Sequence, residues 1–491
     1  MNEKFSHYIV LSIIVLFLIL KISFMINVDY PSYSSYYGLR YVNYVQDNYV
    51  PMIFDNLSYQ GRLIVNNIPF YMILSILTLI IPTLFFFKFI NMFLGALLIY
   101  LIYKLLIKFN FNPVIALLIT IISCLVPLIF SSFLNSFSLF SFFAIICLLL
   151  IYYFPNVEQN KDLIKFIILF VLATIISPYS LILVFGFIFY FILLKLLSLP
   201  IKKNISELIL FFSLFSFWYH LIFYKNSLMK YGFSIIWQNI PEGLINLSYI
   251  KITPLVIIIG LGFIPLILGL LGLYSTLFIK PKKNMLIVAS FTIIFTIISI
   301  LGIIPFYNAL IILTIFSLIL SANGLEYLFT YLDNTLLQRF KLPLIIFILV
   351  FSIFNFMPVL YDSSFTINSP NQDEINTMNF LKENTPLEST ILGDVVEGHL
   401  INFQANRKNF YDENFFLMQS ANQRYQDARI VFLSKSRANI LEQLNYYNID
   451  YIYFSKLTKL RYPNVNFLIQ NDECFEKIFF TNTTEVYKRK C

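Results

Sequence analysis

Apolar and polar positions alternate along the chain in long blocks. Up to about residue 361, long runs of apolar residues are separated by short polar segments. A helix that crosses a bilayer needs about 20 such residues. Twelve runs are therefore candidate membrane helices, at residues 7–26, 68–86, 88–107, 112–130, 134–154, 163–177, 179–199, 207–223, 252–279, 284–302, 304–322 and 341–360.

The positions of lysine and arginine select among the possible arrangements. If 68–86 lies in the membrane interface and the other eleven runs span, the segments "IKKN" and "KPKKN" face the cytoplasm with most other loop lysines, as the positive-inside rule requires. If 68–86 spans, both segments face outward. Pro69 and Pro82 suit a surface helix better than a spanning one, with a kinked span as the alternative. We therefore predict about eleven spans, a cytoplasmic N-terminus and an extracytoplasmic C-terminus.

Three segments then share the outer face: 27–87, 224–251 and 362–491. The last begins with many turn-forming residues and continues with strand-like stretches such as "NIDYIYFS", "STILGDV" and "EVYKRK". Between the turn-forming start and the strand-like stretches, the sequence predicts an amphipathic helix whose apolar residues are Ile375, Met378, Phe380 and Leu381. We predict a transmembrane domain over 1–361 and a mixed α/β domain over 362–491 outside the membrane.

Composition supports a polytopic membrane protein. The 491 residues are 59% hydrophobic and 12% charged, with a mean hydropathy of +0.77, whereas soluble domains carry about 25% charged residues. The net charge of +8 lies mostly in loops between apolar runs, so it does not indicate nucleic-acid binding. The first run has no small-residue cleavage site, which indicates a retained span. Of four cysteines, Cys124 and Cys147 lie in apolar runs, whereas Cys474 and Cys491 lie in the polar tail and could pair.

Candidate chemistry begins where the first span ends. The stretch "VDYPSYSSYYGLRY", residues 28–41, contains Asp29 and Arg40, and Asp55 and Arg62 follow in the same long loop. Long loops tend to carry function. A carboxylate at the membrane boundary could be a general base, a metal ligand or a solvated helix end. The arginines could bind a phosphate or lipid headgroups, and the tyrosines could stack on sugars or form an interfacial belt.

This loop resembles the first outer loop of the GT-C class of polytopic glycosyltransferases. The order "D-x-P…YYGLRY…FDNLSYQGR…P" carries the resemblance, through Asp29, Tyr36, Tyr37, Arg40, Asp55, Ser58, Gly61, Arg62 and Pro69. The resemblance implies a sugar donor linked to a polyprenyl phosphate or diphosphate. It also implies two helices of this loop that lie on the membrane, in agreement with the interfacial placement of 68–86.

The tail is similar to the soluble domain of oligosaccharyltransferase catalytic subunits. Their Trp-Trp-Asp-Tyr-Gly motif, with a later Arg and Asp, corresponds here to Gly393, Asp394, Val395, Val396, Glu397, Gly398 and His399, then Arg407 and Asp412. The tryptophan pair is absent, and the second outer loop, "SSFLNSFS", has no acidic pair. These departures argue against peptide N-glycosylation and against obligate metal dependence. A divalent cation, Mg or Mn, stays open, with Asp29 and Glu242 as its candidate ligands.

The resemblance implies a membrane glycosyltransferase in which Asp29 takes the proton of an acceptor hydroxyl. Arg40, Arg62 and Lys88 would face the leaving phosphate, with Tyr36, Tyr37 and Asp55 as further candidates for binding the substrate or its phosphate. On the acceptor side, which can be glycan, lipid or protein, the candidates are Asp394, Glu397, His399, Arg407 and Asp412. The alternatives are a transporter or flippase, an oligosaccharyltransferase-like protein that acts on protein acceptors, and a non-catalytic binding protein. Transporters usually carry charges at mid-membrane, whereas Lys21 and His220 lie near the ends of spans, where Lys21 is expected to reach toward the surface.

Overall fold

The chain folds into two compact units. The computed structural model describes residues 3–26, 28–58, 60–64, 67–135, 137–201, 203–237, 240–245, 254–361, 369–462, 469 and 473–491. The helical unit comprises Met1–Asn27, Phe89–Lys225 and Ile252–Ile367, and the α/β unit comprises Val28–Lys88, Asn226–Lys251 and Asn368–Cys491. The three segments that we assigned to one face of the membrane thus gather in one unit. Lys202 and parts of the middle loop and of the tail's start lie outside the described residues.

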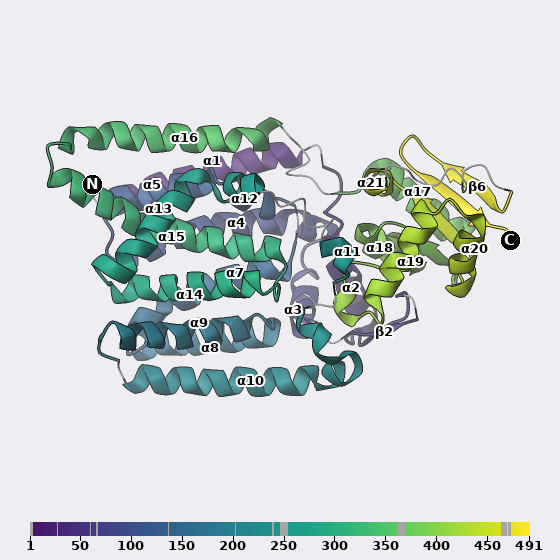
Figure 1. Ribbon diagram of the computed structural model, residues 1–491, viewed down its shortest axis with the longest axis horizontal. Helices are drawn as coiled ribbons and strands as arrows, with labels where there is room; N and C mark the ends of the chain where they lie inside the picture. Colours follow the sequence, from purple (N-terminus) through teal and green to yellow (C-terminus); the bar gives the residue numbers. More distant parts are fainter. Residues whose placement is uncertain are drawn as a thin grey trace. The chain divides into compact units, whose positions relative to one another are not determined.

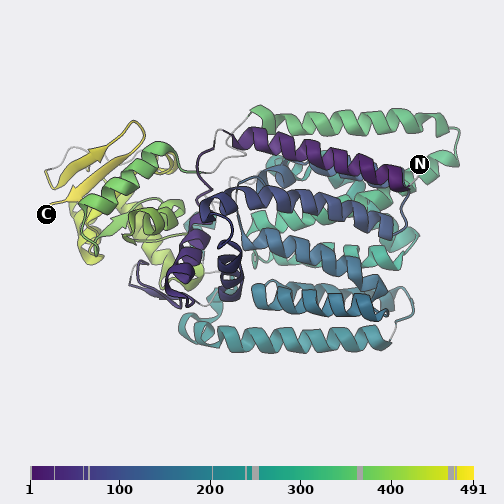
Figure 2. The ribbon, with the colours of Figure 1, turned by 180° about the vertical axis from the view of Figure 1, so that it is seen from behind.

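Long apolar helices form the helical unit, and they run side by side with α10 at one edge (Figure 1, Figure 2). Its main helices are α1 (Glu3–Met25), α4 (Thr83–Lys108), α5 (Pro113–Cys124), α6 (Pro127–Ser132), α7 (Leu139–Tyr153), α8 (Asn160–Ile176), α9 (Ser180–Leu196), α10 (Lys203–Tyr231), α12 (Pro254–Leu261), α13 (Phe263–Tyr274), α14 (Lys283–Ile300), α15 (Phe306–Asp333) and α16 (Lys341–Tyr361). Among the described residues, seven helices are long and apolar enough to cross a membrane, and several others are apolar but shorter. The chain is a polytopic helical membrane protein, as predicted.

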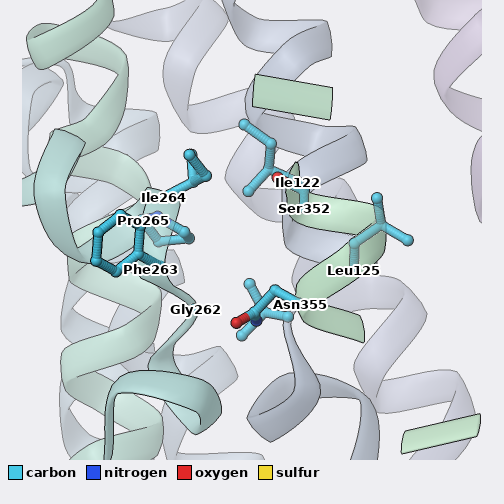
Figure 3. Close-up of a pocket in the computed structure, with 9 residues that line it drawn as sticks. Ile122, Leu125, Gly262, Phe263, Ile264, Pro265, Ser352 and Asn355 are labelled. Carbon is cyan, nitrogen blue, oxygen red and sulfur yellow. The ribbon is translucent and has the colours of Figure 1, made fainter. Parts of the chain in front are cut away.

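Two of the predicted runs contain breaks. Residues 112–130 divide into α5 and α6 just before Pro127, and residues 252–279 divide into α12 and α13 at Gly262, whose φ of 83° favours glycine. Both breaks line a small pocket, together with Ser352 and Asn355 of α16 (Figure 3). Asn355 Nδ2 donates to the carbonyl of Ile259 at 3.2 Å, which satisfies a carbonyl that the break in the helix leaves without its usual partner.

The run 68–86 is not one helix. Helix α3 (Ile68–Leu77) has ten residues, and α4 begins only at Thr83. Ten helical residues rise about 15 Å, which is half the thickness of a bilayer core. The run therefore cannot cross as a single helix that ends at residue 86, and its placement in the interface stays a prediction.

Lys21 differs from the expectation for a lysine near the end of a span. Its side chain is fully buried and donates to the carbonyl of Phe133 at 2.8 Å, immediately after α6, with the rings of Phe17 and Phe130 beside it. A cation at a helix C-terminus is favourable because the carbonyls there carry partial negative charge. Lys21 thus closes the end of α6 and does not extend to the surface.

The α/β unit is built on a mixed five-stranded sheet in the order β4-β3-β5-β7-β6. The strands are β3 (Thr390–Leu392), β4 (Lys408–Asn409), β5 (Tyr451–Phe454), β6 (Phe475–Phe480) and β7 (Glu485–Arg489). Strand β3 pairs in parallel with β4 and β5, whereas β7 pairs antiparallel with β5 and β6. The three strand-like stretches of the sequence are therefore confirmed as β3, β5 and β7.

Helices and a disulfide complete this unit. Its helices include α2 (Ser35–Asn48), α3, α11 (Glu242–Ile245), α17 (Gln372–Asn384), α18 (Gly398–Leu400), α19 (Ala421–Leu433), α20 (Arg437–Tyr446) and α21 (Lys456–Arg461). The predicted amphipathic helix is α17, whose Ile375, Met378 and Leu381 are buried. Cys474 and Cys491 form a disulfide, and Cys124 and Cys147 are buried free thiols.

Candidate active site

Asp29 lies in a short strap, residues 28–34, between α1 and α2. Most of the strap is packed: Val28 and Tyr33 are each 3% exposed, and Ser32 is 2% exposed. Asp29 is exposed, and Lys88 near the start of α4 lies close enough for the two charges to interact. The strap therefore presents one carboxylate to solvent from an otherwise fixed backbone, with a cation nearby.

Two arginines and two carboxylates form a network deeper in the same unit. Arg40 of α2 makes a two-pronged ion pair with Asp55, and Arg62 Nε lies 3.3 Å from the same carboxylate. Both Nη atoms of Arg62 donate to Asp412, at 2.8 and 2.7 Å. Arg62 thus joins the first loop to the tail domain across a sequence separation of 350 residues.

Local backbone geometry aligns these side chains. Strands β1 (Phe54–Asp55) and β2 (Arg62–Leu63) pair antiparallel, which places Asp55 opposite Arg62. After β1, the backbone N–H groups of Leu57 and Ser58 both donate to Asp55 Oδ1, at 3.1 Å each. Gly61 takes a φ of 67° beside the ring of Phe54, so a side chain there would strain the turn. The sequence "FDNLSYQGR" is therefore a hairpin that orients one carboxylate.

Burial and charge oppose each other in this network. Burial alone would raise the pKa of Asp55, but Arg40 and Arg62 outweigh it and hold that pKa below its ordinary value. The same balance, with Arg62 and His399 as the neighbouring groups, holds the pKa of Asp412 well below its usual range. His399 Nδ1 lies 3.8 Å from Asp412, and burial lowers the pKa of His399 to about 4 despite that carboxylate. At neutral pH the network therefore contains two anions, two guanidinium groups and a neutral imidazole.

Of the two predicted tyrosines, Tyr36 lies in the interior and Tyr37 lies beside this network. Tyr36 is 1% exposed, and its ring lies 5.6 Å from that of Phe403. The ring of Tyr37 lies 5.1 Å from His399 and 5.5 Å from Tyr71. Tyr36 packs inside the unit, and Tyr37 is partly exposed.

Solved structures share this architecture. An archaeal oligosaccharyltransferase, AglB from Archaeoglobus fulgidus in complex with an inhibitory peptide and a dolichol-phosphate, superposes with a TM-score of 0.67 at 14% identity over 93% of this chain and 70% of that one. The A. fulgidus enzyme in complex with Zn and sulfate gives 0.63 at 14% identity, over 91% and 68%. ArnT from Cupriavidus metallidurans bound to undecaprenyl phosphate gives 0.54 at 10% identity, over 99% and 98%.

The fold is that of the GT-C glycosyltransferases. The three structural neighbours above establish this likeness over nearly the whole chain. No protein-family model and no curated protein matches the sequence. The resemblance first noticed in "VDYPSYSSYYGLRY" is thus confirmed at the level of the fold.

Within this GT-C fold, the predicted tail residues separate into distinct groups. His399 and Asp412 join the arginine network. Asp394 begins a short helical turn, pairs with Arg461 at 2.9 Å, and donates its backbone N–H to the buried carboxylate of Glu397. Burial raises the pKa of Glu397 well above its usual value.

Arg407 belongs neither to the arginine network nor to the group around Asp394 and Glu397. It lies at the end of a helix. It donates to the carbonyls of Lys382 and Thr385 at 2.6 Å each, so it closes the C-terminus of α17. The structure therefore brings five predicted residues together (Arg40, Asp55, Arg62, His399 and Asp412) and places Arg407 apart.

Sequence reasoning missed two groups of contacts. Asn409 Nδ2 donates to Asp412 at 3.0 Å and completes the network. Tyr33 donates to Glu374 of α17 at 2.6 Å. The sequence pattern Asn371-x-x-Glu374 is typical of a helix capping box, and it could have drawn attention to Glu374. The structure forms this capping box at the start of α17.

The described residues show no cluster of potential metal ligands. They contain no group of three or more His, Cys, Asp or Glu placed to hold one. The charged neighbour of Asp29 is Lys88, whose positive charge disfavours a second cation there. Glu242 begins α11, but its side chain lies outside what the structure describes.

Proposed function

We propose that the protein is a membrane glycosyltransferase that transfers a sugar from a polyprenyl-phosphate-linked donor to an acceptor at the outer face of the membrane. The observation that carries the proposal is Asp29, an exposed carboxylate on a packed strap beside Lys88, in a chain with the GT-C fold. Two structural neighbours were solved with dolichol-phosphate and with undecaprenyl phosphate. These lipids support a donor in which the sugar is linked to a polyprenyl phosphate.

Asp29 is the general base in this proposal. Its carboxylate accepts the proton of the acceptor's nucleophilic group as that group bonds to the anomeric carbon. The bond from the anomeric carbon to the phosphate oxygen breaks, and the electron pair leaves with the lipid phosphate. A single carboxylate suffices for such a displacement, and a positioned base contributes about 10²–10⁴-fold.

Cations near Asp29 and on α2 would receive the leaving phosphate. Lys88 is the nearest candidate, since it interacts electrostatically with Asp29. Arg40 is partly exposed, with 12% of its side chain accessible, so it can share its charge between Asp55 and a ligand.

Arg62, in contrast to Arg40, is almost inaccessible to a ligand. It is 3% exposed, and its donors face Asp55 and Asp412. We propose that Arg62 supports the site and does not touch the donor.

The partly exposed Tyr37 is proposed to bind substrate, and His399, whose ring lies 5.1 Å from that of Tyr37, is proposed to belong to the acceptor side. Asp394, Glu397, Arg407 and Asp412 are buried and bonded within the α/β unit, so they would act by holding that surface in place. The acceptor can be a glycan, a lipid or a protein. We propose a multi-pass arrangement in the cell membrane with the N-terminus in the cytoplasm and the α/β unit outside.

Substitution of Asp29 by Asn tests the proposal. The gene is deleted in the source organism and complemented with wild type, Asp29→Asn or Asp47→Asn. Asp47 is an exposed carboxylate of α2 in the same loop, so it is a matched control. Mass spectrometry of surface glycoproteins and glycolipids should show a glycan lost on deletion, restored by wild type and by Asp47→Asn, and absent with Asp29→Asn. Restoration by Asp29→Asn would remove the base role, and an unchanged profile on deletion would remove the transferase.

A further inference from the structure

The strap that carries Asp29 is tied at two points to the first turn of α17. Tyr30 donates its hydroxyl to Gln372 Oε1 at 2.8 Å, and Tyr33 donates to Glu374 Oε2 at 2.6 Å. These tyrosines lie one and four residues after Asp29. Because Val28 before it is also buried, the backbone of Asp29 is held on both sides.

Glu374 is the stronger of the two anchors. It is 2% exposed, and its Oε2 also accepts the backbone N–H of Asn371 at 2.8 Å, while its own N–H donates to Asn371 Oδ1 at 2.8 Å. One carboxylate oxygen therefore both caps α17 and receives Tyr33. A hydrogen bond from a hydroxyl to a buried carboxylate is among the strong kinds, because its acceptor is charged.

The first two turns of α17 are bonded to the turn between β6 and β7. Thr483, between β6 and β7, donates to Asp373 Oδ2 at 3.0 Å, and the hydroxyls of Thr377 and Thr484 lie 2.6 Å apart. The path from Asp29 through Tyr33 and Glu374 thus ends on a β-hairpin of the tail domain. A rigid element holds a functional side chain more accurately than a loop can.

We propose that Tyr33 and Glu374 are positioning residues for Asp29, so that the tail domain sets the geometry of proton transfer in the first loop. The inference rests on the proposed function, since it assigns to Asp29 the base role. Tyr33 touches no reacting atom; it fixes the backbone from which the carboxylate projects. Small displacements of a catalytic group reduce the rate much more than they reduce binding.

The test compares Tyr33→Phe with a matched variant in purified full-length protein. Tyr447→Phe removes an equivalent buried bond from a tyrosine to a carboxylate, that of Asp427, at a place remote in sequence from the strap. Both variants lose one buried hydrogen bond, so their melting temperatures should fall by similar amounts. Sugar transfer is followed with polyprenyl-phosphate-sugar extracted from the source membranes.

We expect Tyr33→Phe to affect the maximal rate much more than the half-saturating donor concentration. Tyr33→Phe should lower the maximal rate about tenfold or more, with the half-saturating donor concentration within about twofold of wild type. Tyr447→Phe should leave both parameters unchanged. Glu374→Ala should behave like Tyr33→Phe, and Glu374→Gln should retain most of the rate because an amide oxygen can accept both hydrogen bonds.

Two outcomes overturn the inference and are distinct from failure of the proposed function. If Asp29→Asn is inactive and Tyr33→Phe keeps the wild-type maximal rate, the positioning role is wrong and the function stands. The same conclusion follows if Tyr447→Phe lowers the maximal rate as much as Tyr33→Phe, because the effect would then be general destabilisation. If Asp29→Asn is fully active, the proposed function itself fails.

Discussion

His399 makes the arginine network sensitive to acid. Its imidazole is buried between Tyr37 and Asp412, and burial lowers its pKa to about 4 from an unfolded value of about 6.5. The unfolded chain therefore takes up this proton at a higher pH than the folded chain does. The stability that the neutral imidazole contributes is fully present above pH 6.5, and it is lost as the pH falls through about 4.

The expected loss of stability toward acid pH can be tested. Glu374 and Glu397 have raised pKa values because they are buried, so they oppose the histidine in the same pH range. The informative quantity is therefore the difference between wild type and His399→Gln. The free energy of unfolding, followed through melting temperatures from pH 7.5 to pH 4, should fall more steeply for wild type than for His399→Gln, by on the order of 3 kcal/mol over the whole window. Parallel curves for the two proteins would show that His399 does not carry the effect.

The residues of the candidate site show what a sequence can and cannot supply. Asp29, Arg40, Asp55 and Arg62 are visible because they are charged residues in a long aromatic loop after an apolar run. The partner of Arg62 is not visible, because Asp412 lies 350 residues away and nothing in either segment specifies that pairing. Tyr33 and Glu374, which lie 341 residues apart, escaped notice for the same reason. Local patterns predict which residues are unusual, and the tertiary fold decides whether they face solvent or one another.

At the scale of elements, hydropathy predicted where helices lie but not where they break. In the runs 112–130 and 252–279, the local signals of the interruptions are Pro127 and Gly262, and both runs remain mostly apolar through them. Strands β3 and β5 were predictable because their apolar residues are concentrated in short stretches, whereas "EVYKRK" indicated β7 more weakly. The two-residue strands β1, β2 and β4 were not, because they are defined by their pairing partners.

The packing of α13 against α15 in the helical unit depends on small residues. A Cβ added to Gly272 would lie 1.9 Å from the carbonyl oxygen of Leu320, and one added to Gly324 would lie 2.2 Å from that of Leu268. These contacts are with backbone atoms, which cannot rotate away. Small residues at helix interfaces are the usual means of close approach in membranes, where the hydrophobic effect does not drive helices together.

Gly272→Ala should therefore destabilise the protein markedly. We expect a cost of about 1–3 kcal/mol or more from overpacking, measured as a lower melting temperature of the purified full-length protein in detergent. Gly260→Ala in α12 is the matched control, because a Cβ there meets nothing within 4 Å. The control should melt at the wild-type temperature or slightly above it, since alanine favours helix. Equal melting of Gly272→Ala and wild type would contradict the packing argument.

At the scale of the whole molecule, the disulfide and the charge pattern point to the same orientation. Cys474 and Cys491 are bonded, and disulfides persist mainly in oxidising compartments outside the cytoplasm. The lysine-rich segments such as "KPKKN" lie in the helical unit, as expected for loops that face the cytoplasm. Two independent kinds of chemistry therefore favour an α/β unit on the outer face.

Cysteine labelling in intact cells tests this orientation. The wild-type chain has a low background because Cys124 and Cys147 are buried and the other two cysteines are bonded. Asn482→Cys, in the exposed turn between β6 and β7, should react with a membrane-impermeant maleimide added to intact cells. Lys203→Cys, exposed at the start of α10, should react only after the membrane is opened. After treatment with a membrane-impermeant reductant, the exposed Cys491 should also react from outside. The reverse labelling pattern would place the α/β unit in the cytoplasm, and Asp29 would then lie on the side opposite to the one required by the proposed transfer.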